Sequence, residues 1–268
     1  MLTGHDVDMT GSPRIGMVTA VLAAFLMISL PIVILAHADD GIDRETLFQL
    51  NTLDAFLDGH YDGLMPYSEI FKKGDTGLGT FHAVDGEMVA FDGKYYQICY
   101  DGSVNRVSGD FTSPLCMVTW FDVDASVLLG DVNFSETKIA LDELRDSDNY
   151  IYVFVAKGHL DSVTTRSFAP FDEPYPPLSE ANSSFFTAED IDGTLVIMWF
   201  PSALGGINLD DYHMHFLSDD LSLGGHVVEM QVESMSVEMD CTPYFDLRLP
   251  ATDDFRDWEY STDDRGIE

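Results

Sequence analysis

The 268-residue sequence predicts an α+β fold with largely antiparallel β-sheets and few helices. Three Asp-Gly pairs follow one another closely, at Asp85-Gly86, Asp92-Gly93 and Asp101-Gly102. Each pair predicts a tight hairpin turn, because a type I′ turn needs positive φ at both central residues. Apolar and aromatic segments of strand length lie between and after these turns. Two longer segments, 43–58 and 135–146, instead have the apolar spacing or the capping residues of helices.

The elements are expected in a simple order along the chain. An amphipathic helix at 43–58 and a short helix at 68–72 precede a glycine-rich lead-in at 74–80. Strands are expected at 78–84, 87–91, 94–100, 103–107, 115–121, 150–155, 160–168, 194–200, 212–216, 226–233 and 244–249, and a second long helix at 135–146 begins with Ser135 as its N-cap. The proline-rich segment 170–177 is expected to be irregular and to join two lobes, 39–169 and 170–268.

The N-terminal part of the chain has the pattern of a targeting segment. Residues Ile15 to Ala36 are almost wholly apolar, Arg14 supplies the positive flank, and Ala36-His37-Ala38 resembles a cleavage site. The apolar run also exceeds the ~20 residues that a membrane-spanning helix needs. Residues 1–38 are therefore predicted to be a secretory signal peptide or an uncleaved membrane anchor. The folded part is expected to begin near Asp39, to be exported, and to meet the membrane only through this segment.

The charge of the chain is strongly negative. It has 47 acidic and 13 basic residues, a formal net charge of −34. This argues against a nucleic-acid partner, because phosphate contacts need clustered Lys and Arg side chains. Salt screens the self-repulsion of such a charge, so the acidic excess indicates adaptation to high salt. The alternative is an acidic exported protein with no special habitat.

Three cysteines, Cys99, Cys116 and Cys241, show no spacing typical of a metal site. An odd number leaves room for at most one disulfide within the chain. Their redox state stays open.

A cluster of histidines gives the strongest indication of function. Residues 212–216 have the alternation of a β-strand, so one face is expected to carry Tyr212, Met214 and Phe216 and the other His213 and His215. Gly224-Gly225 lets the backbone return closely before His226. Three neutral imidazoles suit a zinc-type ion and leave a coordination position open, as in catalytic sites. The alternative is a pair of histidines on a solvated strand face.

Several short motifs are distributed over the chain after its apolar segment: Leu57-Asp58-Gly59-His60-Tyr61-Asp62-Gly63, Gly74-Asp75-Thr76-Gly77-Leu78-Gly79-Thr80-Phe81, Val84-Asp85-Gly86-Glu87, Thr165-Arg166, Pro174-Tyr175-Pro176-Pro177, Gly206-Ile207-Asn208, Tyr212-His213-Met214-His215-Phe216 and Gly224-Gly225-His226. Together they resemble the α-acetolactate decarboxylase family. The resemblance implies a zinc-dependent carboxy-lyase that converts 2-acetolactate to acetoin and carbon dioxide. It also implies a homodimer of two-lobed α+β subunits built on mixed sheets.

The resemblance also implies roles for particular residues. The zinc ligands would be His213, His215 and His226, and the other active-site residues Glu87, Arg166, Glu268 and Thr80, with Thr80 and Arg166 in contact with substrate. The sequence departs from the family pattern in two places. The segment after Pro250 is short and ends at Glu268, and His82 stands where the family has an asparagine after Thr-Phe.

These residue types suit a decarboxylation. Loss of carbon dioxide pushes electrons onto the neighbouring ketone, and a dication with an open position stabilises the resulting enediolate. The planar fork of Arg166 suits carboxylate or enediolate oxygens, and Glu87 or Glu268 would supply the proton.

Two other classes of protein remain open. A cupin-like oxygenase also has His-x-His on a strand, but Asp219-Asp220 is a poor substitute for its usual glutamate ligand. A non-catalytic exported metal-binding protein would need the histidines but neither Glu87 nor Arg166.

Overall fold

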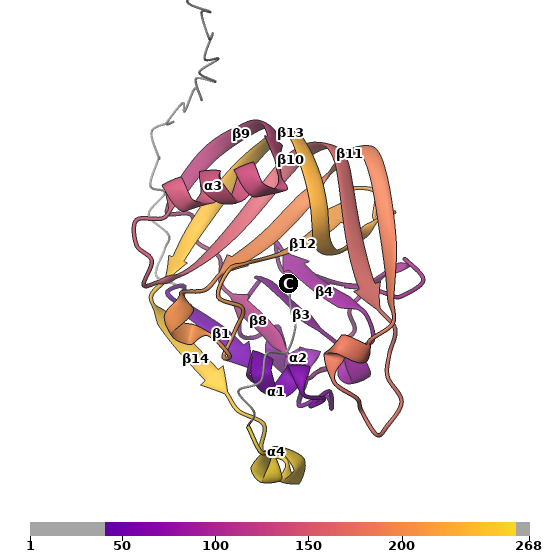
Figure 1. The fold of residues 1–268 in the computed structure, drawn as a ribbon. Helices are drawn as coiled ribbons and strands as arrows, with labels where there is room; N and C mark the ends of the chain where they lie inside the picture. Colours follow the sequence, from indigo (N-terminus) through magenta and orange to yellow (C-terminus); the bar gives the residue numbers. More distant parts are fainter. Residues whose placement is uncertain (1–40, 261–268) are drawn as a thin grey trace, which may run out of the picture.

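Residues 41–260 are described by a computed structural model, which contains two large β-sheets (Figure 1). The first sheet has seven strands in the order β14-β1-β8-β3-β4-β5-β6. It is mixed, because β14 runs parallel to β1 whereas the other neighbours are antiparallel. Its strands are β1 Thr46–Leu50, β3 Thr76–Thr80, β4 Glu87–Phe91, β5 Lys94–Ile98, β6 Val104–Arg106, β8 Cys116–Thr119 and β14 Tyr244–Arg248. A small ribbon pairs β2 Met65–Pro66 with β7 Thr112–Ser113.

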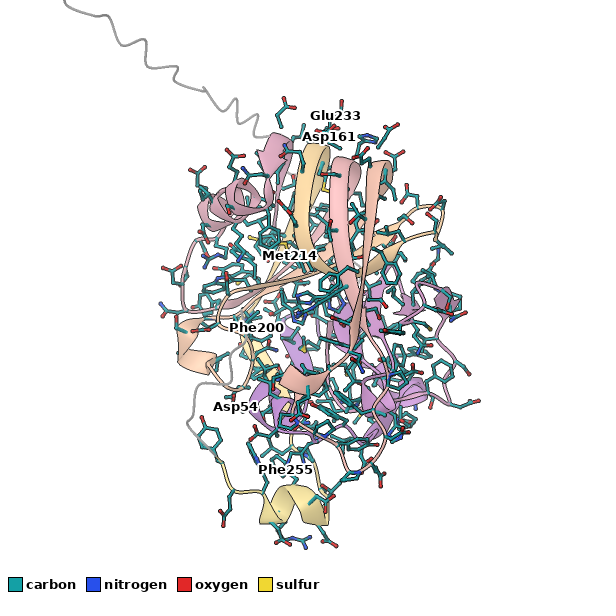
Figure 2. The ribbon with its side chains drawn as sticks, turned by 45° about the vertical axis from the view of Figure 1, so that its right-hand side comes forward. Asp54, Asp161, Phe200, Met214, Glu233 and Phe255 are labelled. Carbon is teal, nitrogen blue, oxygen red and sulfur yellow. The ribbon has the colours of Figure 1, made fainter. Side chains whose placement is uncertain are left out.

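The second sheet closes on itself. Its strands are β9 Ala125–Asn133, β10 Ile151–Phe168, β11 Ser183–Trp199, β12 Tyr212–Ser218 and β13 Gly224–Thr242. The long strand β10 pairs with both β11 and β13, so β10 to β13 form a closed ring to which β9 is added. Figure 2 shows Asp161 and Glu233 at one end of this ring, and Asp54 and Phe255 at the opposite end of the molecule.

Four α-helices accompany the sheets in the part of the chain that the structure describes. These are α1 Leu53–Leu57, α2 Tyr67–Ile70, α3 Phe134–Leu144 and α4 Asp253–Asp257. The longest, α3, contacts β9 and β13 and packs Leu141 against the apolar interior of the closed sheet. The predicted α+β class with mixed, largely antiparallel sheets is therefore confirmed.

The apolar side chains form three cores. One fills the closed sheet and includes Met214 and Phe216 of β12. Another lies between the two sheets and contains Val89 of β4, whereas Met88 and Ala90 face a third core on the outer side of the first sheet. This alternation follows from the strand period of two. The predicted packed face of 212–216 is confirmed, and the opposite face of β12 turns towards the first sheet.

The predicted helix at 43–58 is wrong in its first half. Residues 46–50 form β1, and only 53–57 form α1. Leu47 packs between the sheets while Phe48 and Leu50 pack on the outer side, so a strand buried on both faces imitates a helical apolar pattern. The two elements meet at Asn51, where φ is +68°.

Three other predicted features have different bounds in the structure. Strands 150–155 and 160–168 are one strand, β10, whose pairing with β13 is irregular near His159 and Leu160. Helix α3 begins one residue earlier than expected, with Asn133 rather than Ser135 as N-cap, because Asn133 and Glu136 form a reciprocal capping box. The expected lobe boundary at 169/170 falls at the end of β10 and not between the sheets, since β9 and β10 belong to the second sheet and β14 to the first.

Some expectations concern the termini and the cysteines. The predicted signal peptide or anchor at 1–38 lies outside the described residues. Between residues 41 and 260, no helix is long and apolar enough to cross a membrane. All three cysteines are free thiols.

A buried carboxyl group makes stability depend on pH. Asp240 is almost fully buried next to Asp122 and Asp124, and burial is the main cause that raises its pKa to about 8. The folded chain therefore keeps this proton up to about pH 8, whereas an unfolded aspartate loses it near pH 4. The native state binds more protons in this window, so the contribution of Asp240 to stability falls as pH rises from about 4 to 8.

We therefore expect Asp240→Asn to raise the free energy of unfolding at pH 7 by on the order of 2 kcal/mol and to have little effect at pH 4. Urea unfolding at both pH values measures the difference. Asp161→Asn, at an exposed position on β10, is the control. An equal effect of Asp240→Asn at both pH values would contradict a buried protonated carboxyl.

Candidate metal centre

Three histidine side chains meet between the two sheets. His213 and His215 lie on β12, and His226 lies on β13 directly opposite His215. One ring nitrogen from each lies within 4.8 Å of the others, and the Nε2 atoms of His213 and His215 are 3.1 Å apart. Two ligands of one tetrahedral zinc ion would be about 3.3 Å apart, given Zn–N bonds near 2.0–2.1 Å. The spacing of this pair suits a common metal ion.

The orientation of His215 is fixed by a backbone group of the first sheet. Its Nδ1 atom lies 2.8 Å from the carbonyl oxygen of Met88, and the ring is fully buried. Because a carbonyl only accepts, Nδ1 carries the hydrogen and donates it. The Nε2 lone pair is then left free to face the other histidines, which is how metal-binding imidazoles are usually held.

Gly225 brings β13 close to β10. It has a φ of +126°, and a Cβ there would lie 2.5 Å from the carbonyl oxygen of Arg166. A larger residue would push the strands apart at the point where Arg166 pairs with His226. The Gly-Gly-His motif thereby places His226 and Arg166 side by side.

Burial keeps the three imidazoles neutral. Desolvation lowers the pKa of His213 to about 4, and it lowers the pKa values of His215 and His226 well below their ordinary value. Neutral imidazole is the form that binds a metal. The donor set, its spacing and its protonation state therefore fit a divalent zinc-type ion.

Glu87 and Thr80 lie beside the histidines at one end of a hairpin. They are directly paired on β3 and β4, and the Thr80 hydroxyl donates to the carbonyl of Gly86 over 2.6 Å. A Glu87 carboxyl oxygen lies 3.5 Å from Nε2 of His215. Burial raises the pKa of Glu87 to about 8, although the nearby charge of Arg166 works in the opposite direction. At neutral pH this carboxyl group is mainly protonated and can donate a proton.

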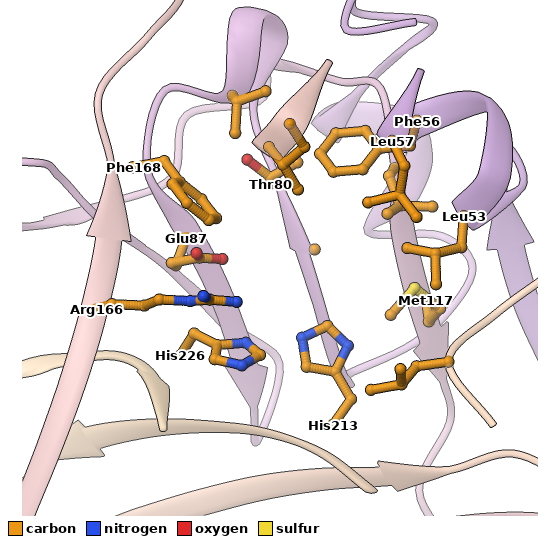
Figure 3. Close-up of a pocket in the computed structure, with 15 residues that line it drawn as sticks. Leu53, Phe56, Leu57, Thr80, Glu87, Met117, Arg166, Phe168, His213 and His226 are labelled. Carbon is orange, nitrogen blue, oxygen red and sulfur yellow. The ribbon is translucent and has the colours of Figure 1, made fainter. Parts of the chain in front are cut away.

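Arg166 completes the polar end of the pocket. Figure 3 shows its guanidinium beside the Glu87 carboxyl and above the ring of His226. Its Nε atom is buried without a hydrogen-bond partner, which leaves a donor available for a bound group. A planar cationic fork in this position suits a carboxylate.

Much of the remaining lining of the pocket is apolar and was not predicted. The apolar lining includes Leu53, Phe56, Leu57, Leu115, Met117, Phe168, Leu178 and Leu209. Figure 3 shows Leu53, Phe56, Leu57 and Met117 across the pocket from Arg166, and Phe168 beside Glu87. The pocket has about 640 Å³ of empty space, including space open to solvent. The leucines of α1 were visible in the sequence only as one face of an amphipathic helix, so nothing distinguished them from ordinary core residues.

Of the two departures from the family pattern, the structure describes the one at His82 but not the one at Glu268. His82 is exposed, and its Nδ1 accepts a hydrogen bond from the backbone N–H of Gly63 over 3.1 Å, so it links two loops outside the pocket lining. Glu268 lies outside the described residues, and its predicted role stays a prediction. The structure brings the remaining predicted residues together: His213, His215, His226, Glu87, Arg166 and Thr80.

The fold and the site define a two-sheet α+β protein with a buried three-histidine centre next to a glutamate and an arginine. The model of the family "Alpha-acetolactate decarboxylase" matches residues 47–262. An alpha-acetolactate decarboxylase of Methanosarcina mazei is 40% identical over 214 residues, which cover 79% of this chain and 74% of that protein. The Bacillus licheniformis enzyme of that name is 33% identical over 243 residues, 88% of this chain and 94% of that protein.

Solved structures agree with the sequence matches. The crystal structure of alpha-acetolactate decarboxylase from Bacillus subtilis superimposes with a TM-score of 0.79 at 32% identity, covering 81% of this chain and 94% of that one. The chain therefore belongs to the α-acetolactate decarboxylase family and is an enzyme of the carboxy-lyase class. A cupin-like oxygenase and a non-catalytic metal-binding protein are no longer supported.

Proposed function

We propose that this chain decarboxylates 2-acetolactate to acetoin and carbon dioxide in the pocket between its two sheets, with a metal ion held by His213, His215 and His226. The observation that carries the proposal is the meeting of three imidazoles, a buried glutamate and an arginine in one largely apolar pocket. Zinc is the ion that best suits three nitrogen ligands with an open position. When bound, such an ion supplies Lewis-acid stabilisation of negative charge on the substrate oxygens.

Side chains of the protein bind the substrate, exclude water and supply the proton. Arg166 binds and orients the substrate carboxylate, and the apolar wall accepts the two methyl groups and excludes water. When the bond to the carboxylate carbon breaks, its electron pair moves towards the neighbouring ketone. The product then needs one proton at the former carboxylate-bearing carbon, and Glu87 holds one in the pocket. Glu268 remains the second predicted donor.

The activity is tested by incubating the purified protein with racemic 2-acetolactate. We expect equal amounts of acetoin and carbon dioxide to form faster than in the spontaneous reaction. Chiral chromatography of the acetoin then shows whether protonation occurs on one face. Absence of acetoin above the spontaneous rate would contradict the proposed activity.

Arg166 is expected to act through its geometry rather than its charge alone. Arg166→Ala should lower kcat/KM by on the order of 100-fold, and Arg166→Lys should restore little of this loss, because a point charge cannot replace a two-pronged donor. Steady-state kinetics of both variants, with metal content measured in parallel, provide the test. If the lysine variant had nearly the turnover of the natural chain, Arg166 would be supplying only positive charge.

The proposal also includes the homodimer and the export that the sequence suggested. The homodimer rests on the family resemblance, and a monomeric mass in analytical ultracentrifugation would exclude it. Export rests on the apolar segment at 15–36. Fractionation of producing cells, with the enzyme found only inside, would exclude that part.

A further inference from the structure

A second cavity meets the metal pocket at three shared residues. This outer groove is lined by Phe134 and Lys138 of α3, by residues 210–212 and by Val227 and Val228 of β13, and it has about 1300 Å³ of empty space, including space open to solvent. Arg166, Leu209 and His226 line both the groove and the metal pocket. These three side chains lie at the boundary between the two cavities and are called the neck below. Leu209 is the aliphatic member of the three, and its only role in the proposed function is its share in the apolar lining.

Hydrogen bonds between buried side chains and the backbone fix the position of Leu209. The preceding residue, Asn208, is almost fully buried, and its side-chain oxygen accepts from the backbone N–H of Leu209 over 2.7 Å. The side-chain nitrogen of Asn208 donates to Oε1 of Gln49 over 2.8 Å. The Nε2 atom of fully buried Gln49 in turn donates to the carbonyl of Ile207 over 2.7 Å. Leu209 therefore follows a segment tied to β1 by side-chain hydrogen bonds.

The same segment also holds helix α1, whose Leu53 and Leu57 line the pocket. The carbonyls of Gly206 and Ile207 accept from the backbone N–H groups of Asp54 and Leu53, in the first turn of α1. Gly206 has a φ of +81°, and a Cβ there would lie 2.6 Å from the Asp54 carboxylate. The spacing between Leu209 and the leucines of α1 is thus set by short, specific bonds rather than by loose apolar packing.

We propose that Leu209 determines which alkyl groups the enzyme accepts on its 2-hydroxy-3-oxo acid substrate, and that Asn208 is the residue that positions it. This rests on the proposed function. A methyl group fits within the inner pocket, whereas a longer alkyl chain extends through the neck and meets the Leu209 side chain. Arg166 and His226, the other two neck residues, would be held by the substrate and by the metal ion, which leaves Leu209 to set the width of the passage.

The test compares two substrates that differ only in the group on the hydroxyl-bearing carbon, 2-acetolactate with a methyl group and its analogue with a propyl group. We expect Leu209→Ala to raise the ratio of kcat/KM for the propyl over the methyl substrate by about tenfold, the range that one or two methylenes provide in an apolar pocket. Leu209→Val should raise the ratio less and serves if the alanine variant does not fold. Val228→Ala removes apolar volume from the outer groove alone and should change the ratio by less than about twofold.

Binding gives a readout that does not require turnover. The corresponding 2,3-dihydroxy acids lack the ketone and do not decarboxylate, so calorimetry with the methyl and propyl forms should show the same shift in relative affinity. Asn208→Ala should shift both ratios in the direction of Leu209→Ala, with Asn208→Asp, which keeps the acceptor for the Leu209 N–H, in between. A lower melting temperature with unchanged ratios would show that Asn208 is only structural.

These experiments distinguish a wrong proposed function from a wrong role of Leu209. If the natural chain forms no acetoin, the proposed function is wrong and the role of Leu209 falls with it. If the natural chain decarboxylates 2-acetolactate but both Leu209 variants keep its substrate ratio and relative affinities, the function stands and the neck does not select substrates.

Discussion

Replacing His215 by alanine is expected to remove both the bound metal and the activity. His215 is the most buried of the three histidines and is oriented by the Met88 carbonyl. Its loss leaves two imidazoles that cannot hold the ion in the same position. Lewis-acid stabilisation is worth several kcal/mol. We therefore expect kcat to fall by at least about 10³-fold, since each 1.4 kcal/mol is a factor of ten. His213→Ala and His226→Ala should behave in the same way.

Elemental analysis of the purified variants, with turnover measured on the same samples, tests this expectation. His159→Ala is a matched control, because His159 lies on β10 at the far end of the closed sheet, where it contacts Asp190 and Asp192. It should retain full metal content and turnover. A full equivalent of metal in the His213, His215 or His226 variant would remove that residue from the ligand set.

Glu87→Gln is expected to lower kcat by about 10²–10⁴-fold while the metal remains bound. The amide has nearly the same shape as the carboxyl group, so the hairpin between β3 and β4 should be retained. It has no acidic proton to give to carbon. Glu229→Gln, at an exposed position on β13, is the control and should leave turnover unchanged.

The measurement is single-turnover kinetics together with metal analysis. If Glu87→Gln decarboxylated 2-acetolactate at the natural rate, the proton would have to come from another group. Deleting Glu268 would then be the decisive variant. Loss of turnover in that variant would identify Glu268 as the donor.

Much of the site was predictable because strands impose a simple geometry. The spacing of His213 and His215 placed both on one face, and Gly224-Gly225 indicated a close return before His226. The closeness of Arg166 to His226 could not be predicted from strand alternation or from a local turn. Residues 166 and 226 become neighbours through the pairing of β10 with β13, which depends on the closure of the whole sheet.

The fold was predictable where local signals were strong. All three Asp-Gly pairs lie between short strands of the first sheet, in the connections of the antiparallel meander from β3 to β6. Of the three, Asp92-Gly93 has positive φ at both residues, as a type I′ turn requires. The helix expected at 43–58 failed because Leu47 and Phe48 are buried on opposite faces of one strand, a feature that periodicity cannot distinguish from a helix. The polar residues near His159 suggested that a strand ends there. They instead mark an irregularity in the pairing of β10 with β13, so the full length of β10 was not predicted.

Titration of the metal-free enzyme with zinc tests the central claim most directly. After removal of metal with a chelator, acetoin formation from 2-acetolactate should be lost and should return in proportion to added zinc, with a plateau at one ion per chain. The His215→Ala variant should show no such recovery. Full turnover of the metal-free enzyme, or recovery of the His215→Ala variant with one equivalent of zinc, would contradict a catalytic metal held by His213, His215 and His226.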